Sequence, residues 1–137
     1  MEKFIKVSQL PDNAENVLEL ETPERYSCRV WRYAAGHSRL AIALNQDDAN
    51  SYDPNYAIFE TVEYFEDIMS WQGANLKVAS REESVKQKMN IQGTPIAKLP
   101  ELPYTLPMRL FTFDVANVQI KILASLLTLT NDISSLP

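Results

Sequence analysis

An alternating segment near the N-terminal third constrains the fold of this chain more than any other feature. Tyr26, Cys28 and Val30 alternate with polar or charged residues, and the alternation returns over residues 40–44 after the sequence AAGHS. A period of two is typical of strands that bury one face, and a short glycine-containing connection between two such runs is typical of a hairpin. We therefore predict an antiparallel strand pair with its turn at AAGHS.

Two further segments are predicted to be strands. The sequence YAIFETVEYFE at residues 56–66 is rich in β-prone residues, but its alternation changes phase after Phe59. Such a break predicts a bulge or kink near Glu60 or Thr61. The sequence LKVAS at residues 76–80 is short and predicts an inner strand.

A helix is predicted over about residues 80–90. Ser80 is followed three residues later by Glu83, the spacing of a capping box. Val85 and Met89 lie four residues apart, so a helix here presents a narrow apolar stripe to a sheet.

The segment at residues 115–131 fits two patterns. Val118, Ile120 and Ile122 alternate as in a strand, while apolar residues also recur at helical spacing. We favour two consecutive strands with a kink near Ala124, because β-branched residues are enriched here. A helix is the alternative.

Together these elements predict an α+β fold, with a largely antiparallel sheet of about six or seven strands and one short helix. The chain of 137 residues is expected to form a single domain over residues 1–137. Residues 93–107 hold four of the eight prolines and are predicted to be a surface loop.

The sequence lacks the elements of most recognisable catalytic or cofactor sites. Cys28 is the only cysteine and His37 the only histidine, so neither a structural zinc site nor a histidine-pair metal site is expected. The glycines do not form a phosphate-binding loop or a dinucleotide fingerprint. In a hairpin Cys28 lies far from His37, and we expect Cys28 to be a core residue. No cofactor is predicted.

Carboxylates suggest two further functions that we do not favour. A hydrolase would need His37, or a pair among Glu60, Glu63 and Glu66, to converge in a cleft. The oxygen-rich sequence QDDANSYDPN resembles a cation-binding loop, but it fails as an EF-hand because Asp53 stands where the glycine is required. We interpret both features as solvated surface.

Negative charge is concentrated in the middle of the chain. Residues 40–76 carry a net charge of −7, against +2 for the rest. The seven acids are Asp47, Asp48, Asp53, Glu60, Glu63, Glu66 and Asp67. Residues 25–39 carry four arginines and no acid, so arginines are expected to face glutamates across adjacent strands. The overall charge of −5 argues against a nucleic-acid partner.

The heptapeptide SWQGANL at residues 70–76 is interpreted as a corner between two strands. Gly73 permits a positive φ, Asn75 tolerates one, and Trp71 is large enough to anchor the corner in the core. The alternative is a recognition patch, because tryptophan is also enriched at interface hot spots.

The chain is expected to act in the cytoplasm and away from membranes. Its first residues alternate charged and apolar side chains and do not resemble a signal peptide. The apolar-rich segment at residues 115–129 is too short, and contains too many polar residues, to span a bilayer. Pairing of this run with its counterpart would cover it, which favours a homodimer.

These observations favour a non-catalytic binding or regulatory protein with a protein partner, and the excess of negative charge points to a basic one. The predicted contact residues are in an acidic loop and at the aromatic corner: Asp47, Asp48, Asp53, Glu66, Asp67 and Trp71. The alternative is a half-barrel that binds a small molecule in an aromatic pocket. That pocket would be lined by Tyr26, Trp31, Tyr33, Phe59 and Tyr64.

Overall fold

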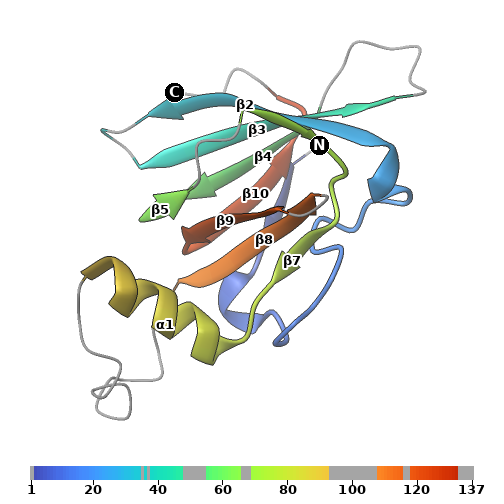
Figure 1. The fold of residues 1–137 in the computed structure, drawn as a ribbon. Coiled ribbons are helices and arrows are strands. Elements are labelled where there is room, and N and C mark those ends of the chain that lie inside the picture. The colour runs from blue at the N-terminus through green and yellow to red at the C-terminus, as the bar shows by residue number, and fades with distance from the viewer. Residues whose placement is uncertain are drawn as a thin grey trace.

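The computed structural model describes residues 2–34, 36, 38–47, 55–65, 69–92, 108–115 and 118–132. These residues form ten strands and one α-helix, α1 (Arg81–Gln92), which confirms the α+β prediction (Figure 1). Two short 3₁₀ turns, η1 (Val7–Gln9) and η2 (Pro23–Arg25), lie in the N-terminal part. The strands are β1 (Glu2–Ile5), β2 (Tyr26–Ala34), β3 (Arg39–Gln46), β4 (Asn55–Glu60), β5 (Tyr64–Phe65), β6 (Ser70–Gln72), β7 (Leu76–Val78), β8 (Arg109–Val115), β9 (Val118–Ala124) and β10 (Leu126–Thr130).

The strands form two antiparallel sheets around one core. The larger sheet has the order β1-β10-β4-β3-β2-β6, and the smaller has the order β5-β9-β8-β7. Ile42 and Phe59 of the larger sheet and Phe111 and Ile122 of the smaller sheet belong to the same buried cluster. The rings of Phe59 and Phe111 meet edge to face with centroids 5.5 Å apart.

The predicted hairpin is confirmed as β2 and β3. Tyr26 pairs with Gln46, and the register continues to Ala34 opposite Arg39. A bulge between Val30 and Arg32 shifts the register by one residue, which the alternation did not predict.

Two chain segments cross from one sheet to the other at the same corner. Strand β4 ends at Glu60, Thr61 adopts a φ of 54°, and the chain continues as β5 of the smaller sheet. Beside it, Ser125 separates β9 from β10, and its N–H donates to the Glu60 carbonyl (3.2 Å). The predicted kinks near Thr61 and Ala124 are therefore confirmed as crossings between sheets. Residues 118–130 form strands, so the helical alternative is wrong there.

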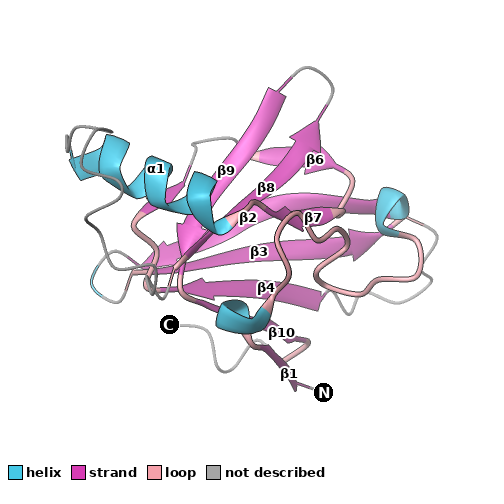
Figure 2. Cartoon of the chain, turned by 90° about the horizontal axis from the view of Figure 1, so that it is seen from below, coloured by secondary structure: helices cyan, strands magenta, loops and turns pink. Residues whose placement is uncertain are grey.

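Helix α1 covers the outer face of the smaller sheet (Figure 2). Ser80 Oγ accepts a hydrogen bond from the Glu83 N–H (3.1 Å), which confirms the predicted N-terminal cap. Val85 and Met89 are buried, as the apolar stripe predicted. The predicted loop at residues 93–107 lies outside the described residues.

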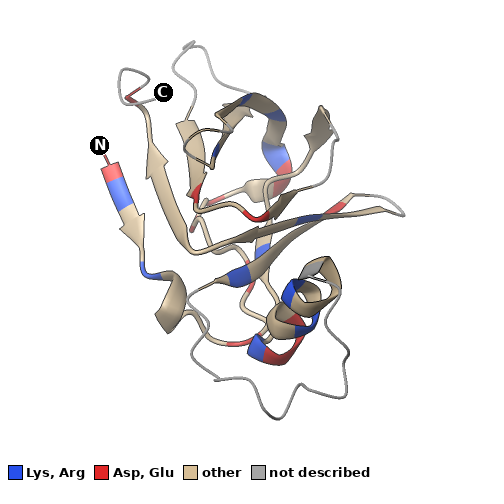
Figure 3. Cartoon of the chain, turned by 90° about the vertical axis from the view of Figure 1, so that its left-hand side faces the viewer, with Lys and Arg blue, Asp and Glu red and all other residues tan. Residues whose placement is uncertain are grey.

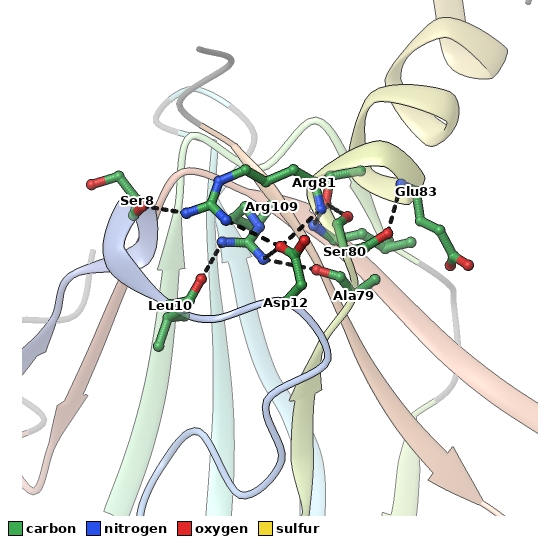
Figure 4. Close-up of polar contacts among 10 residues, drawn as sticks. Ser8, Leu10, Asp12, Ala79, Ser80, Arg81, Glu83 and Arg109 are labelled. Carbon is green, nitrogen blue, oxygen red and sulfur yellow. Dashed lines mark hydrogen bonds and ion pairs between the residues drawn. The ribbon is translucent and has the colours of Figure 1, made fainter. Parts of the chain in front are cut away.

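A buried arginine ties the N-terminal segment to the end of β7 (Figure 4). The Arg109 guanidinium donates to the carbonyls of Leu10 (2.7 Å) and Ala79 (2.9 Å) and to Asp12 Oδ1 (3.0 Å). Arg81 donates to the same carboxylate oxygen at 3.1 Å. Burial lowers the pKa of Arg109. Both terminal nitrogens of the guanidinium donate to protein acceptors, although Nε has no partner among the described residues. We therefore assign this cluster a structural role.

Candidate functional site

The heptapeptide at residues 70–76 forms the corner between β6 and β7, as predicted. Gly73 has a φ of 102°, and its N–H donates to the Tyr26 carbonyl (2.7 Å). The N–H of Ala74 donates to the Pro23 carbonyl (2.8 Å). The left-handed backbone at Gly73 is therefore held by bonds to the segment that enters β2.

Trp71 belongs to the core at this corner. Its side chain is only 7% exposed, and its ring centroid lies 5.1 Å from that of Phe113. The indole therefore anchors β6 against the smaller sheet. In this position Trp71 cannot provide the exposed surface that a recognition hot spot requires.

Asp47 lies directly against the corner. Its carboxylate accepts hydrogen bonds from Gln72 Nε2 (2.7 Å) and Ser27 Oγ (2.8 Å), and its N–H donates to the Arg25 carbonyl (2.8 Å). Gln72 Nε2 also donates to the Glu24 carbonyl (3.0 Å). These bonds fix the exposed carboxylate of Asp47 at one position. One of the donors, Gln72, is 25 residues away from Asp47 in the sequence.

An open hollow of about 360 Å³ lies at this corner. It is lined by Pro23, Glu24, Gln72, Gly73, Asn75, Phe113 and Asp114. Its polar lining includes two carboxylates and two amides, so it is rich in hydrogen-bond acceptors. We call this hollow, together with Asp47 and Ser27, the acidic corner.

Asp114 carries a negative charge in this lining. Its carboxylate accepts hydrogen bonds from Lys77 (2.7 Å) and Gln119 (3.1 Å). The Lys77 bond, followed by the Gln119 bond, lowers the pKa of Asp114. Lys77 is also within 3.3 Å of Glu15, so one ammonium group lies between two carboxylates.

Other acids of the central segment are paired within the protein or lie outside the described residues. Glu60 pairs with Arg39 across β3 and β4, which confirms the expected arginine–glutamate contact. Glu63 pairs with Lys88 of helix α1 at 2.7 Å. Four predicted contact residues lie outside the described residues: Asp48, Asp53, Glu66 and Asp67.

The five aromatic residues of the predicted pocket are distributed over separate contacts. Trp31 packs on Tyr56 on the outer face of the larger sheet, while Phe59 is fully buried against Phe111. The other three are Tyr26, against the main core, Tyr33, against Phe65, and Tyr64, in a small cluster with Leu123. This arrangement gives no support to a shared aromatic cavity.

Cys28 is not suited to nucleophilic chemistry. It is buried in the main core, and burial raises the pKa of its thiol to about 12, with a smaller opposing effect from Trp71. The thiol is therefore uncharged near neutral pH. His37 lies outside the described residues. Within the described ranges, no group of three histidine, cysteine, aspartate or glutamate side chains is placed to hold a metal ion.

Comparison with protein-family models, curated proteins and solved structures found no significant match. None of the helices in the described part of the chain is long and apolar enough to cross a membrane. Sequence reasoning missed Ser27, Glu24, Asn75 and Asp114 as members of the acidic corner. They come from three distant segments, and no local pattern in the sequence brings them together.

Proposed function

We propose that this chain is a non-catalytic cytoplasmic binding protein that accepts a cationic group of a protein partner at the acidic corner. The observation that carries this proposal is the fixed position of Asp47. Ser27 and Gln72 hold its carboxylate beside the hollow that Glu24 and Asp114 line. A prepositioned carboxylate loses little conformational entropy when a lysine or arginine binds.

The charge of the corner supports a basic partner. Glu24 is exposed, and the two hydrogen bonds that the Asp47 carboxylate accepts from described residues come from neutral donors, the hydroxyl of Ser27 and the amide of Gln72. Its negative charge is therefore not neutralised by these contacts. Charges at such a site steer association and raise its rate at low salt.

The shape of the corner favours a protein partner over a small apolar ligand. Among the described residues that line the hollow, Phe113 is the only aromatic one, and it is almost fully buried. A site that encloses a small molecule is usually lined by apolar and aromatic groups. An open polar hollow is better suited to a side chain that extends from a larger surface.

Affinity capture from a lysate of the source organism, followed by mass spectrometry, tests the proposal. The bait is the wild type, a Glu24→Lys/Asp47→Lys variant, or the control Glu82→Lys, which reverses an exposed charge on helix α1. We expect a basic protein that the wild type and the control capture and the double variant does not. Equal capture by all three baits would contradict the proposal, provided that circular dichroism shows all three to be folded.

A further inference from the structure

Among the described strands, β1 leaves one edge of the larger sheet open. It pairs with β10 through Glu2 to Ile5, and it is the first strand in the order of this sheet. In Figures 2 and 3 no described strand lies on its other side. The backbone N–H and C=O groups on that side are able to pair with another extended chain.

Apolar side chains are exposed at this edge. Phe4 is 73% exposed, and Leu126 of the adjacent β10 is 51% exposed. Phe4 lies opposite Thr128, which is two residues from Leu126, so all three side chains share the outer face. The exposed ring at the open edge is a surface that a second chain would cover.

The charges around Phe4 make the edge complementary to itself. The sequence from residue 2 to residue 6 is Glu-Lys-Phe-Ile-Lys, and the backbone at Lys6 is still extended. When two copies of this strand pair antiparallel with Phe4 opposite Phe4, Glu2 of each copy lies opposite Lys6 of the other. Opposite charges that face each other across a ladder stabilise it.

We propose that the open edge of β1 is a homodimer interface, in which β1 pairs antiparallel with β1 of a second copy and Phe4 lies at the twofold axis. The two larger sheets then form one continuous sheet. A twofold interface uses the same patch on both copies, as the symmetric pattern of charges around Phe4 requires.

Neighbouring registers are less favourable. A shift that centres the axis on Lys3 places Lys3 opposite its own copy. A shift that centres it on Ile5 places Phe4 opposite Lys6 and loses both Glu2–Lys6 pairs. Like charges in directly opposite positions destabilise a strand pair. The register centred on Phe4 is therefore selected by charge as well as by the apolar contact.

The dimer interface is separate from the acidic corner. Strands β1 and β6 are the two opposite edges of the larger sheet, and β6 leads into the corner. Dimerisation through β1 therefore leaves both corners open to partners. From the sequence, we expected the C-terminal segment to pair with the same segment of a second copy. Strand β10 cannot do so, because it already lies between β1 and β4.

A charge swap tests the interface by sedimentation equilibrium over a range of protein concentrations at low salt. Glu2→Lys alone and Lys6→Glu alone each place like charges opposite each other at two symmetric positions. We expect each to raise the dimer dissociation constant by about tenfold. The double variant Glu2→Lys/Lys6→Glu restores both pairs with reversed sign and is expected to dimerise like the wild type. The control Glu82→Lys is expected to have no effect.

Three results would overturn the proposal. The first is a wild type that sediments as a monomer at every concentration. The second is a dimer that neither single variant weakens, and the third is a double variant as weak as the single ones. Phe4→Ser removes the central contact without changing charge and is expected to weaken the dimer too. Circular dichroism of each variant checks that the fold is intact.

Discussion

Gln72 Nε2 donates a hydrogen bond to Asp47 Oδ2 over 2.7 Å. This bond joins the β6–β7 corner to the residue that follows β3, so two segments that the sequence keeps apart form one surface. The same amide nitrogen reaches the Glu24 carbonyl. Gln72, together with Ser27, therefore fixes where the Asp47 carboxylate lies.

Replacement of Gln72 by alanine is expected to destabilise the fold slightly. The variant loses the donor to Asp47 and to Glu24, and a typical net hydrogen bond contributes about 0.5–1.5 kcal/mol. Urea unfolding measures the difference in free energy. Gln87→Ala on helix α1 serves as the control and is expected to change stability by less than about 0.5 kcal/mol. A Gln72 variant as stable as this control would argue against a fixed Asp47.

Gly73 and Gly36 are expected to respond differently to alanine. An added Cβ meets no atom within 4 Å at either position, so steric contact does not distinguish them. Gly73 has a φ of 102°, and a left-handed backbone costs other residues about 1–2 kcal/mol. Gly73→Ala should lower the unfolding free energy by about that amount, and Gly36→Ala should leave it nearly unchanged. Equal effects would show that backbone strain at the corner is unimportant.

Several elements of the fold are predictable because their signals are local. The β2–β3 hairpin, the Ser80 cap and the crossings near Thr61 and Ala124 each correspond to a change in periodicity or a capping residue within a few positions. Strand β1 was missed because its four residues obtain their stability from β10, more than 120 residues away. The burial of Arg109 was missed for the same reason, since its acceptors lie in two distant segments.

The acidic corner was predictable only in part. Asp47 and the corner itself were expected, and the burial of Trp71 agrees with its expected role as the anchor of the corner but not with its choice as a contact residue. A tryptophan beside charged and apolar residues has the same local sequence whether it faces a core or a partner. Its position depends on Phe113 of β8, with which it packs.

Arg109 and Arg81 share one carboxylate oxygen of Asp12 but differ in burial. Arg109→Met is expected to lower the unfolding free energy by about 2–4 kcal/mol, because the carbonyls of Leu10 and Ala79 lose this donor. Arg81→Met is expected to cost less than about 1 kcal/mol, since its side chain is 47% exposed. Chemical denaturation of both variants compares them directly, and equal losses would refute the structural role of Arg109.

The Lys77–Asp114 contact is expected to make stability depend on pH at both extremes. Its hydrogen bond lowers the pKa of Asp114 below the ordinary 3.8, so the contribution is present above that value and is lost as the pH falls through the lowered pKa. The bond raises the pKa of Lys77 above 10.5, so the contribution is present below that value and is lost as the pH rises through the raised pKa.

Denaturation of the wild type and Asp114→Asn across the pH range measures this linkage. The stability difference between them should be constant near neutral pH and should shrink in acid below about pH 4. A difference that persists unchanged in strong acid would mean that the charge of Asp114 does not stabilise the fold.

Cys28 is expected to react with a thiol reagent only after unfolding. Burial and the raised thiol pKa both oppose thiolate formation in the native protein. Modification at pH 8 should be slow without denaturant and fast in concentrated urea. Fast modification of the native protein would show that this part of the core opens easily.

The most direct measurement of the proposed binding function is the rate constant for association of the captured partner with the wild type and with Asp47→Lys, over a range of salt concentrations. The wild-type rate constant should be high at low salt and should fall steeply as salt rises. Asp47→Lys should associate more slowly at low salt and show a weaker dependence. Identical rate constants for the two proteins at every salt concentration would contradict a role for the acidic corner.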